Sequence, residues 1–345
     1  TPGTMGSMRP GSETGRSAGL AVIAFLLVAA AITYLGPVLT PVLIALFLYY
    51  IIRPAADALV RRGAPAWLAY LFLFTLTVVA IIWLGRIVHG NMLLVRGRLP
   101  EYRANLLGLL DALPGPQARA QAKDLVAQVF DVSTGDVLGL AFGPAISFLE
   151  TAVMVFFYLF FIIISARRIG GRVQRAFAPE TAGRLLQIGS NINKGIAQYM
   201  KVKTLVSLGI AICQALIAYL FGLHFWPLWA VLMFALNYIT YVGSIAALVP
   251  PVVLAFLQFG NSWTALGLAA LLIINRFVWV DYIEIRLAGK SLNVDPVLLL
   301  ASLAYWGWVW GAVGLVLAAP MLMALKITLA NIESTRRWAV LISDE

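Results

Sequence analysis

The stretch NYITYVGSIAALVPP, residues 237–251, decides how the rest of this chain folds. It lies inside an apolar run, residues 225–259, that is long enough to cross a membrane. Gly243 and the pair Pro250-Pro251 are expected to break a helix there, because proline lacks a backbone donor and clashes with the preceding turn. Within a bilayer, the backbone groups freed by a break must be satisfied by protein or water. The stretch therefore predicts a broken helix beside a polar cavity.

Polar side chains occupy the same stretch. They are Asn237, Tyr238, Thr240, Tyr241 and Ser244. Polar atoms at membrane depth are costly unless they face a cavity or one another. Their coincidence with the helix breakers favours a solute-facing site over a plain membrane anchor.

The composition of the chain is that of a membrane protein. Of its 345 residues, 61% are hydrophobic and 12% are charged, whereas soluble domains contain about 45–50% apolar residues. The predicted fold class is all-α and polytopic. The net charge of +10 comes from basic residues beside apolar segments, which favours membrane lipids over nucleic acid as partners. The single cysteine, Cys213, excludes an intrachain disulfide.

About eight transmembrane helices are predicted, some broken or re-entrant. They cover residues 18–35, 41–52, 66–88, 146–165, 204–223, 225–259, 262–280 and 297–327. Arg53, Arg61 and Arg62 follow the second segment, and a long basic stretch, residues 167–203, follows the fourth. The positive-inside rule places both regions in the cytoplasm, and alternate crossings then place both termini there. Whether residues 225–259 cross once or form a re-entrant hairpin is left open by the sequence.

Six regions follow from this pattern. They are a disordered tag and tail (1–17), spans 1–3 (18–88), an amphipathic extramembrane region (89–145), span 4 with a basic cytoplasmic loop (146–203), a transport core of spans 5–8 (204–327) and a cytoplasmic tail (328–345). In the third region, apolar residues recur every three or four positions from Leu99 to Leu113 and again from Ala118 to Phe130. This spacing predicts two amphipathic helices. They could pack against other subunits of a homo-oligomer or form a small solvated cap.

A second interrupted apolar segment lies near the C-terminus. Residues 306–320, WGWVWGAVGLVLAAP, combine Gly311 and Gly314 with Pro320 in a run otherwise long enough to span. Paired discontinuous helices are typical of secondary transporters, because half-helix ends present unpaired amides and carbonyls to a solute. Small residues that pack helix on helix would produce part of the same pattern.

Ionisable residues precede this segment in NRFVWVDYIEIRLAGKSLNVDP, residues 275–296. Asp281 and Glu284 are three residues apart and share one helical face. Charges at membrane depth usually pair or line a cavity, so these carboxylates are candidates for binding a cation or a proton. For Arg276 and Asp281, functional and purely structural roles are equally favoured. Arg286, Lys290 and Asp295 are better explained as solvated charges of an interfacial loop.

Enzymatic motifs are missing from the sequence. Gly289-Lys290-Ser291 resembles the end of a phosphate-binding loop, but Glu284 occupies the position where that loop needs glycine. The two histidines, His89 and His224, are far apart and form no HExxH motif, and there is no GxSxG elbow. We therefore expect no enzyme, no cofactor and no metal site.

Three stretches of the chain resemble motifs of one known family. Residues 237–251 resemble the Asn-x-Ile-Pro-x-Ile-Gly segment of the autoinducer-2 exporter (AI-2E) family. Residues 275–320 resemble its Asn-rich span, its Gly-x-Ser-Leu-x-x-x-Pro loop and its Gly-x-x-Gly-x-x-x-Ala-x-Pro ending, and residues 41–54 resemble its N-terminal hairpin. The resemblance extends from Pro41 to about Leu341. It implies a transporter in a bacterial or archaeal plasma (inner) membrane.

The resemblance does not fix the substrate. Members are associated with export of a small quorum-sensing furanone, autoinducer-2, and others act as antiporters of sodium or lithium for protons. Thr240 stands where the family usually has proline, which leaves Gly243 and Pro250 to define the first break. Asp281 stands near a position usually held by a neutral residue, which favours an ion-coupled role.

The favoured function is a secondary transporter that works by alternating access at the broken helices. It would export a small polar solute, such as an autoinducer-2-like signal, or exchange cations for protons. The candidate substrate- or ion-binding residues are Gln214, Asn237, Tyr241, Gly243, Pro250, Asn275, Arg276, Asp281, Glu284, Gly311, Gly314 and Pro320. The amides and Tyr241 would supply hydrogen bonds, while Asp281 and Glu284 would titrate or bind a cation. The alternative is a non-transporting membrane scaffold that binds lipid or protein through its basic loop and amphipathic region.

Overall fold

A computed structural model describes residues 34–111, 116–117, 119–121, 123–124, 134–260, 262–288 and 294–343. Within these ranges the chain forms helices and no strands. Six helices are long and apolar enough to cross a membrane, or seven if the bent pair Met154–Ala166 and Arg168–Ala176 counts as one span. The all-α, polytopic prediction is confirmed. The predicted tail (1–17), nearly all of the first predicted span and the apolar positions of the second amphipathic segment lie outside the described residues.

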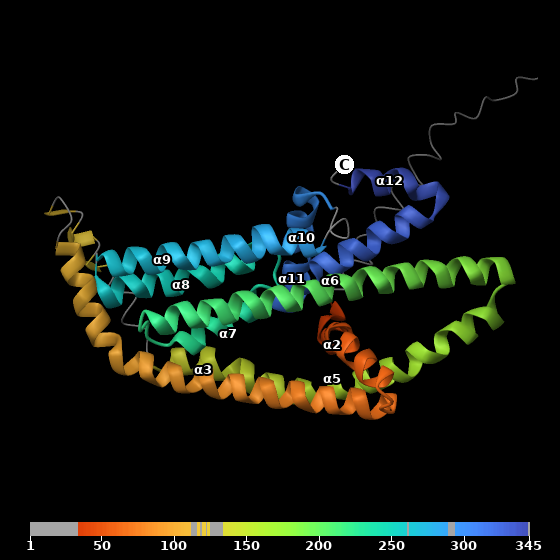
Figure 1. Cartoon of the computed structure of the whole chain (residues 1–345), viewed down its shortest axis with the longest axis horizontal. Helices are drawn as coiled ribbons and strands as arrows, with labels where there is room; N and C mark the ends of the chain where they lie inside the picture. The colour runs from red at the N-terminus through yellow and green to blue at the C-terminus, as the bar shows by residue number, and fades with distance from the viewer. Residues whose placement is uncertain are drawn as a thin grey trace, which may run out of the picture.

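Four long helices build the frame of the molecule: α2 (Gly36–Arg61), α3 (Ala66–Asp111), α5 (Thr134–Ala176) and α6 (Pro179–Leu220). Helix α6 runs along most of the length of the molecule, with α3 and α5 on one side of it (Figure 1). Helix α3 continues without a break from its apolar span into the first amphipathic segment. The basic stretch at residues 167–203 consists almost entirely of the end of α5 and the first half of α6.

The segment at residues 225–259 folds into a helical hairpin, here called the first hairpin. It consists of α7 (Trp226–Leu236) and α8 (Val242–Phe259). Leu228 shares a core cluster with Leu254, and Met233 shares another with Ala247, so the two helices run antiparallel. The chain enters and leaves this hairpin at the same end of the molecule (Figure 1). Residues 225–259 therefore form a hairpin of two helices rather than one continuous helix.

The position of the break differs from the expected one. Pro250 and Pro251 lie inside α8 and do not end it, so the prediction that they break the helix is wrong. The chain reverses at residues 237–241 instead, where Tyr241 has a positive φ of 63°. Membrane helices tolerate an interior proline when neighbouring helices and local adjustments satisfy the freed backbone groups.

The C-terminal apolar segment is also a hairpin, here called the second hairpin. Helix α11 (Pro296–Asn331) has non-helical torsions at Trp310 and Gly311, where φ of the glycine is 59° and ψ is −137°. Ser302 Oγ donates to the carbonyl oxygen of Ala318 at 3.2 Å, which places the two halves side by side. The predicted break is confirmed at Gly311, and the apolar segment predicted at residues 297–327 consists of two helical halves joined there. The left-handed torsion that only glycine adopts readily reverses the chain.

The two hairpins enter the molecule from opposite ends. Between them, α9 (Trp263–Arg276), the π-helix η1 (Phe277–Glu284) and α10 (Ile285–Ala288) form one continuous helical rod. The first hairpin leads into the beginning of this rod, and the second hairpin follows its end (Figure 1). This inverted arrangement matches the discontinuous-helix pattern expected of a secondary transporter.

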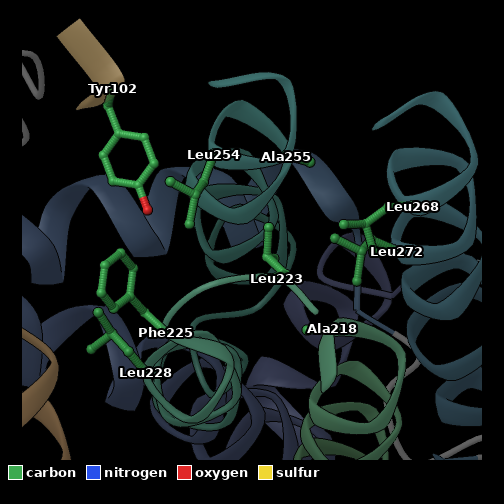
Figure 2. Packing of buried hydrophobic residues seen from close by; sticks show 9 residues of the cluster. All are labelled: Tyr102, Ala218, Leu223, Phe225, Leu228, Leu254, Ala255, Leu268 and Leu272. Atoms are coloured by element: carbon green, nitrogen blue, oxygen red, sulfur yellow. The ribbon is translucent and has the colours of Figure 1, made fainter. Parts of the chain in front are cut away.

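The extramembrane part of α3 packs on the base of the first hairpin. Tyr102, which is 3% exposed, lies in one cluster with Phe225, Leu228 and Leu254, and its hydroxyl points into that cluster (Figure 2). Burial raises the pKa of Tyr102 to about 12. The hydroxyl therefore stays protonated and remains available for hydrogen bonding.

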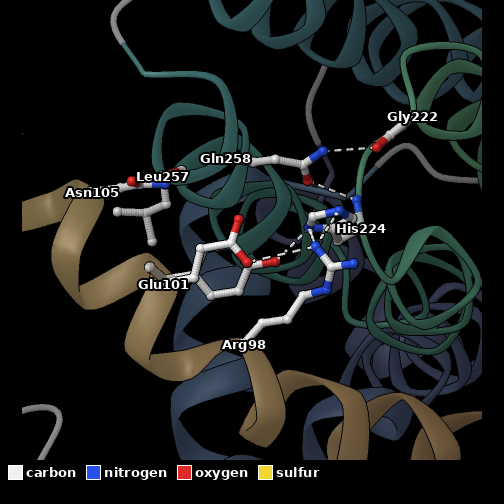
Figure 3. Close-up of polar contacts among 8 residues, drawn as sticks. Arg98, Glu101, Asn105, Gly222, His224, Leu257 and Gln258 are labelled. Atoms are coloured by element: carbon white, nitrogen blue, oxygen red, sulfur yellow. Dashed lines mark hydrogen bonds and ion pairs between the residues drawn. The ribbon is translucent and has the colours of Figure 1, made fainter.

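The His224 ring completes this contact through Arg98 and Tyr102 (Figure 3). Arg98 Nη1 lies 2.8 Å from His224 Nε2, and the Tyr102 hydroxyl lies 2.7 Å from His224 Nδ1. Arginine can only donate, so Nε2 accepts and the neutral ring donates from Nδ1 to Tyr102. Glu101 forms an ion pair with Arg98 at 3.7 Å. Burial, and then the Arg98 guanidinium, lower the pKa of His224.

The contact between α3 and the first hairpin is expected to weaken in acid. A lowered folded-state pKa means that the unfolded chain takes up the proton first, so stability is complete above the ordinary value of 6.5 and falls as pH drops below it. We expect His224→Gln to flatten the pH dependence of the melting temperature between about pH 7 and 5, since glutamine accepts hydrogen bonds without titrating. Thermal melts of both proteins over this range measure the effect, and parallel curves would contradict it.

Candidate functional site

One face of α6 carries a polar strip at the centre of the molecule. Its residues are Tyr199, Lys203, Ser207 and Gln214. The spacing of three and four residues, or a multiple of it, places them on one side of the helix. All four are buried. Buried polar groups need partners, and the first hairpin and the α9–η1 rod supply them.

Hydrogen bonds to α6 hold the tip of the first hairpin, residues 237–241. Asn237 Nδ2 donates to Ser207 Oγ at 2.9 Å, and the hydroxyls of Tyr199 and Thr240 lie 3.1 Å apart. In addition, the Tyr238 hydroxyl donates to Thr204 at 3.0 Å. The tip is thus anchored in the middle of α6 by side chains rather than by apolar packing alone. Such bonds can break and re-form as a hairpin moves.

Close backbone approaches shape both hairpins. A Cβ on Gly243 would lie 1.7 Å from the carbonyl oxygen of Leu236, and a Cβ on Gly314 would lie 1.8 Å from that of Trp306. Real Cβ atoms never approach a carbonyl so closely. Both predicted glycines are therefore structural requirements of the turns. Their roles are the same in the two hairpins, which supports treating the hairpins as a pair.

The rod beside the first hairpin contains a π-helix, η1, at the predicted ionisable stretch. π-Helical turns occur frequently at functional sites. Arg276 Nη1 donates to Asp281 Oδ2 at 2.9 Å, and Arg276 Nε donates to Ser244 Oγ at 3.3 Å. Arg276 therefore links the rod to α8 just beyond the hairpin tip, and this ion pair is only partly buried.

Lys203 and Glu284 form a second, fully buried ion pair. Lys203 Nζ donates to Glu284 Oε1 at 2.7 Å, and the residues are 1% and 6% exposed. Lys203 is not among the predicted site residues, because the sequence places it at the end of the basic stretch, residues 167–203. The structure buries its side chain instead. The signal that could have identified it is its place on the polar face of α6, one turn from Tyr199 and one from Ser207.

A small cavity lies where these elements meet, with a volume of about 80 Å³. Its lining includes Lys203, Thr240, Tyr241, Asp281 and Glu284, and apolar residues of α11 such as Leu299 and Met323 close it. It brings together three of the predicted site residues, namely Tyr241, Asp281 and Glu284. The first hairpin, the π-helix, α6 and the second hairpin all contribute to it.

Other predicted site residues lie elsewhere. Asn275 donates to the carbonyl oxygen of Ile210 at 3.2 Å, and Gln214 donates to that of Trp229 at 3.0 Å, so both join helices to one another. Gly311 lies at the tip of the second hairpin, where Trp306 stacks on Trp310. None of these residues lines the cavity at Glu284.

Pro250 and Pro320 also lie away from the cavity at Glu284. Pro320 lines a separate apolar pocket between α2, α6 and α11. Within the described residues, no cluster of three or more His, Cys, Asp or Glu side chains could hold a metal ion. The side chains that line the cavity thus supply hydroxyls, two carboxylates and one base, Lys203.

Sequence comparisons agree with this architecture. Residues 20–334 match the sequence profile described as AI-2E family transporter. The chain is 27% identical to the AI-2 transport protein TqsA of Escherichia coli over 317 residues, which is 91% of each protein. A Haemophilus influenzae protein named "Putative transport protein" is 26% identical over 336 residues, covering 94% of this chain and 95% of the relative. The E. coli protein named "Putative transport protein YhhT" is 25% identical over 340 residues, covering 96% and 95%.

A match of this length covers the spans, both hairpins and the buried ion pair together. It accords with helices long and apolar enough to span a membrane. The protein is an integral membrane protein, and its relatives are named as transport proteins. The chain belongs to the AI-2E transporter family.

Proposed function

We propose that this protein is a secondary transporter in which the two hairpins alternately expose the cavity at Glu284 to the two sides of the membrane. The observation that carries the proposal is the meeting of the first hairpin's tip, the flank of the second hairpin and two carboxylates around one cavity. Each hairpin reaches this point from its own end of the molecule. Movement of either hairpin would open a path from one side only.

The substrate is either a small polar solute or a cation exchanged for protons. The relative TqsA is named for AI-2 transport, which supports the first. The cavity supports the second, because about 80 Å³ is well below the roughly 300–1,000 Å³ of pockets that hold small organic ligands. An organic solute would need a wider conformation. We favour a small cation as the solute that fits the closed site.

The hairpins also bear on membrane orientation. Each hairpin replaces one predicted crossing with a return to the same side, so the parity of the count is unchanged and both termini stay in the cytoplasm. The loop after α10 then becomes cytoplasmic, and Arg286 and Lys290 obey the positive-inside rule there. We propose this orientation for a bacterial or archaeal plasma membrane. Accessibility of single cysteines placed at residues 62 and 287 would test it, since both should react from the cytoplasmic side.

Reconstitution tests the proposed function directly. Purified protein in liposomes is expected to carry sodium, lithium or a small polar solute above the rate of empty vesicles when a proton gradient is imposed. Asp281→Asn should alter that flux, because it removes the negative charge that pairs with Arg276. Vesicles that carry none of these solutes, under either gradient direction, would refute transport.

The scaffold alternative rests on a different surface. A polar pocket of about 420 Å³ between α2 and α6 is lined by Arg53, Lys194 and Lys201 together with Asp57. The net positive charge of these lining residues favours binding of an anionic lipid headgroup. A scaffold would lose its phenotype when the basic cluster from Arg167 to Arg175 is neutralised, yet keep it in Asp281→Asn. A transporter would show the reverse pattern. Homo-oligomerisation remains a prediction under either function.

A further inference from the structure

Lys203 and Glu284 stand apart from the other charges of the molecule. Within the described ranges they are the two charged residues that are buried. They come from different elements, α6 and η1, and are 81 residues apart in sequence. Removing two charges from water is costly, and a buried pair is weak evidence for stability. Its placement in the cavity at the hairpin tip therefore suggests a role besides stability.

Glu284 has an unused acceptor. Its Oε1 atom binds Lys203, whereas its buried Oε2 atom makes no hydrogen bond in the described part of the chain. Thr240, Tyr241 and Asp281 line the same cavity and add further oxygen atoms. Carboxylate and hydroxyl oxygens are the ligands that hard cations prefer. A cation that entered here would meet oxygen ligands and a carboxylate with free coordination capacity.

The cost of an uncompensated buried charge indicates which positive charge the cavity must lose when a cation enters. The cavity is lined by two carboxylates, Asp281 and Glu284, which pair with Lys203 inside the cavity and with Arg276 beside it, so the two ion pairs together carry no net charge. An added cation would leave an uncompensated buried charge, which is strongly unfavourable. Arg276, the partner of Asp281, cannot be deprotonated in proteins, whereas a buried lysine can. Lys203 is therefore the group that can compensate for an entering cation.

We propose that Lys203 and Glu284 form a one-for-one exchange site, in which a small monovalent cation binds the Glu284 carboxylate and Lys203 releases one proton. One N–H bond of the ammonium breaks, the proton passes to water, and the neutral amine keeps the electron pair. The cation takes the place of the ammonium beside the carboxylate, so the net charge of the cavity is unchanged. This inference rests on the proposed function and assigns its coupling residues.

Other titratable groups face the same place. Tyr241 lies at the hairpin tip, Asp281 lies on η1, and Tyr199 of α6 lies behind Thr240. Asp281 is held by Arg276 at 2.9 Å, and protonated phenols carry no charge to exchange at neutral pH. The exchange is thus a property of Lys203, and it can be separated from these groups by substitution.

Proton release on cation addition tests the exchange without requiring transport. Purified protein in weakly buffered detergent solution with a pH dye receives NaCl, LiCl or KCl, with choline chloride as the control for ionic strength. The wild-type chain is expected to release about one proton for at least one of the three cations, because the buried site keeps its net charge. Lys201→Gln, which removes an exposed charge two residues away, should release the same amount.

Two variants of Lys203 make the test specific. Lys203→Arg keeps the ion pair but cannot lose a proton, so cation-induced release should fall to the choline background. Lys203→Gln has no ammonium at position 203, so any proton that this variant still releases must come from another group of the cavity, such as Glu284. The inference is overturned if the wild-type chain releases no proton with any of the three cations, or if Lys203→Arg releases as much as the wild type.

The outcomes also separate this inference from the proposed function. Proton release in detergent without flux in vesicles would reject transport and keep the exchange site. Flux in the wild-type chain without any cation-induced proton release would keep transport and reject the exchange site.

Discussion

Gly243→Ala is expected to abolish the native form of the first hairpin. The new Cβ would lie 1.7 Å from the Leu236 carbonyl oxygen, and the obstacle is backbone, which has no rotamer to move aside. Overpacking of a core typically costs about 1–3 kcal/mol, and a contact with a fixed backbone belongs at the upper end. The shift needed would also displace the tip that carries Asn237 and Thr240. Melting temperature in detergent and initial flux in liposomes should both fall.

A matched glycine shows whether the effect is specific. Gly85 lies within α3, and a Cβ there would meet no atom within 4 Å. Because alanine is favoured over glycine inside a helix by about 0.5–1 kcal/mol, Gly85→Ala should leave stability unchanged or raise it. Gly314→Ala should behave like Gly243→Ala, since it meets the Trp306 carbonyl oxygen at 1.8 Å. Wild-type melting and flux in Gly243→Ala would show that the close approach is not a constraint.

The second large effect is expected at the buried ion pair. Lys203→Met leaves the Glu284 carboxylate buried without its partner, and breaking a buried pair in this way costs about 3–5 kcal/mol. The double variant Lys203→Met/Glu284→Gln removes both charges at similar volume and should recover most of that loss. Chemical unfolding of the wild type, both single variants and the double variant in one detergent would measure the coupling.

The control for this cycle is Lys201→Met, which removes an exposed charge on the same helix and should shift stability little. A double variant as unstable as the sum of the two single variants would show that the charges do not interact. The double variant is expected to fold but to show no cation-induced proton release, so a loss of release in this variant would not be caused by unfolding.

Much of the fold could be predicted from properties that depend only on residues close together in the sequence. Helical membrane spans follow from apolar length, and the break in α11 follows from Gly311, whose left-handed torsion is set by its own missing side chain. The proline pair at Pro250 shows the limit of such predictions. A lone helix would break there, but α8 packs against α7 and α9 along its length and continues through it.

The sequence by itself determined a helical membrane protein with two interrupted segments, because hydrophobic length and glycine sterics act over a few residues. Only the tertiary structure decided that NYITYVGSIAALVPP turns at residues 237–241 and that its tip meets Lys203 and Glu284. That ion pair joins residues 81 apart in the chain. The sequence pattern around Lys203 does not identify Glu284 as its partner, and the pattern around Glu284 does not identify Lys203. Burial and charge pairing depend on how whole helices pack.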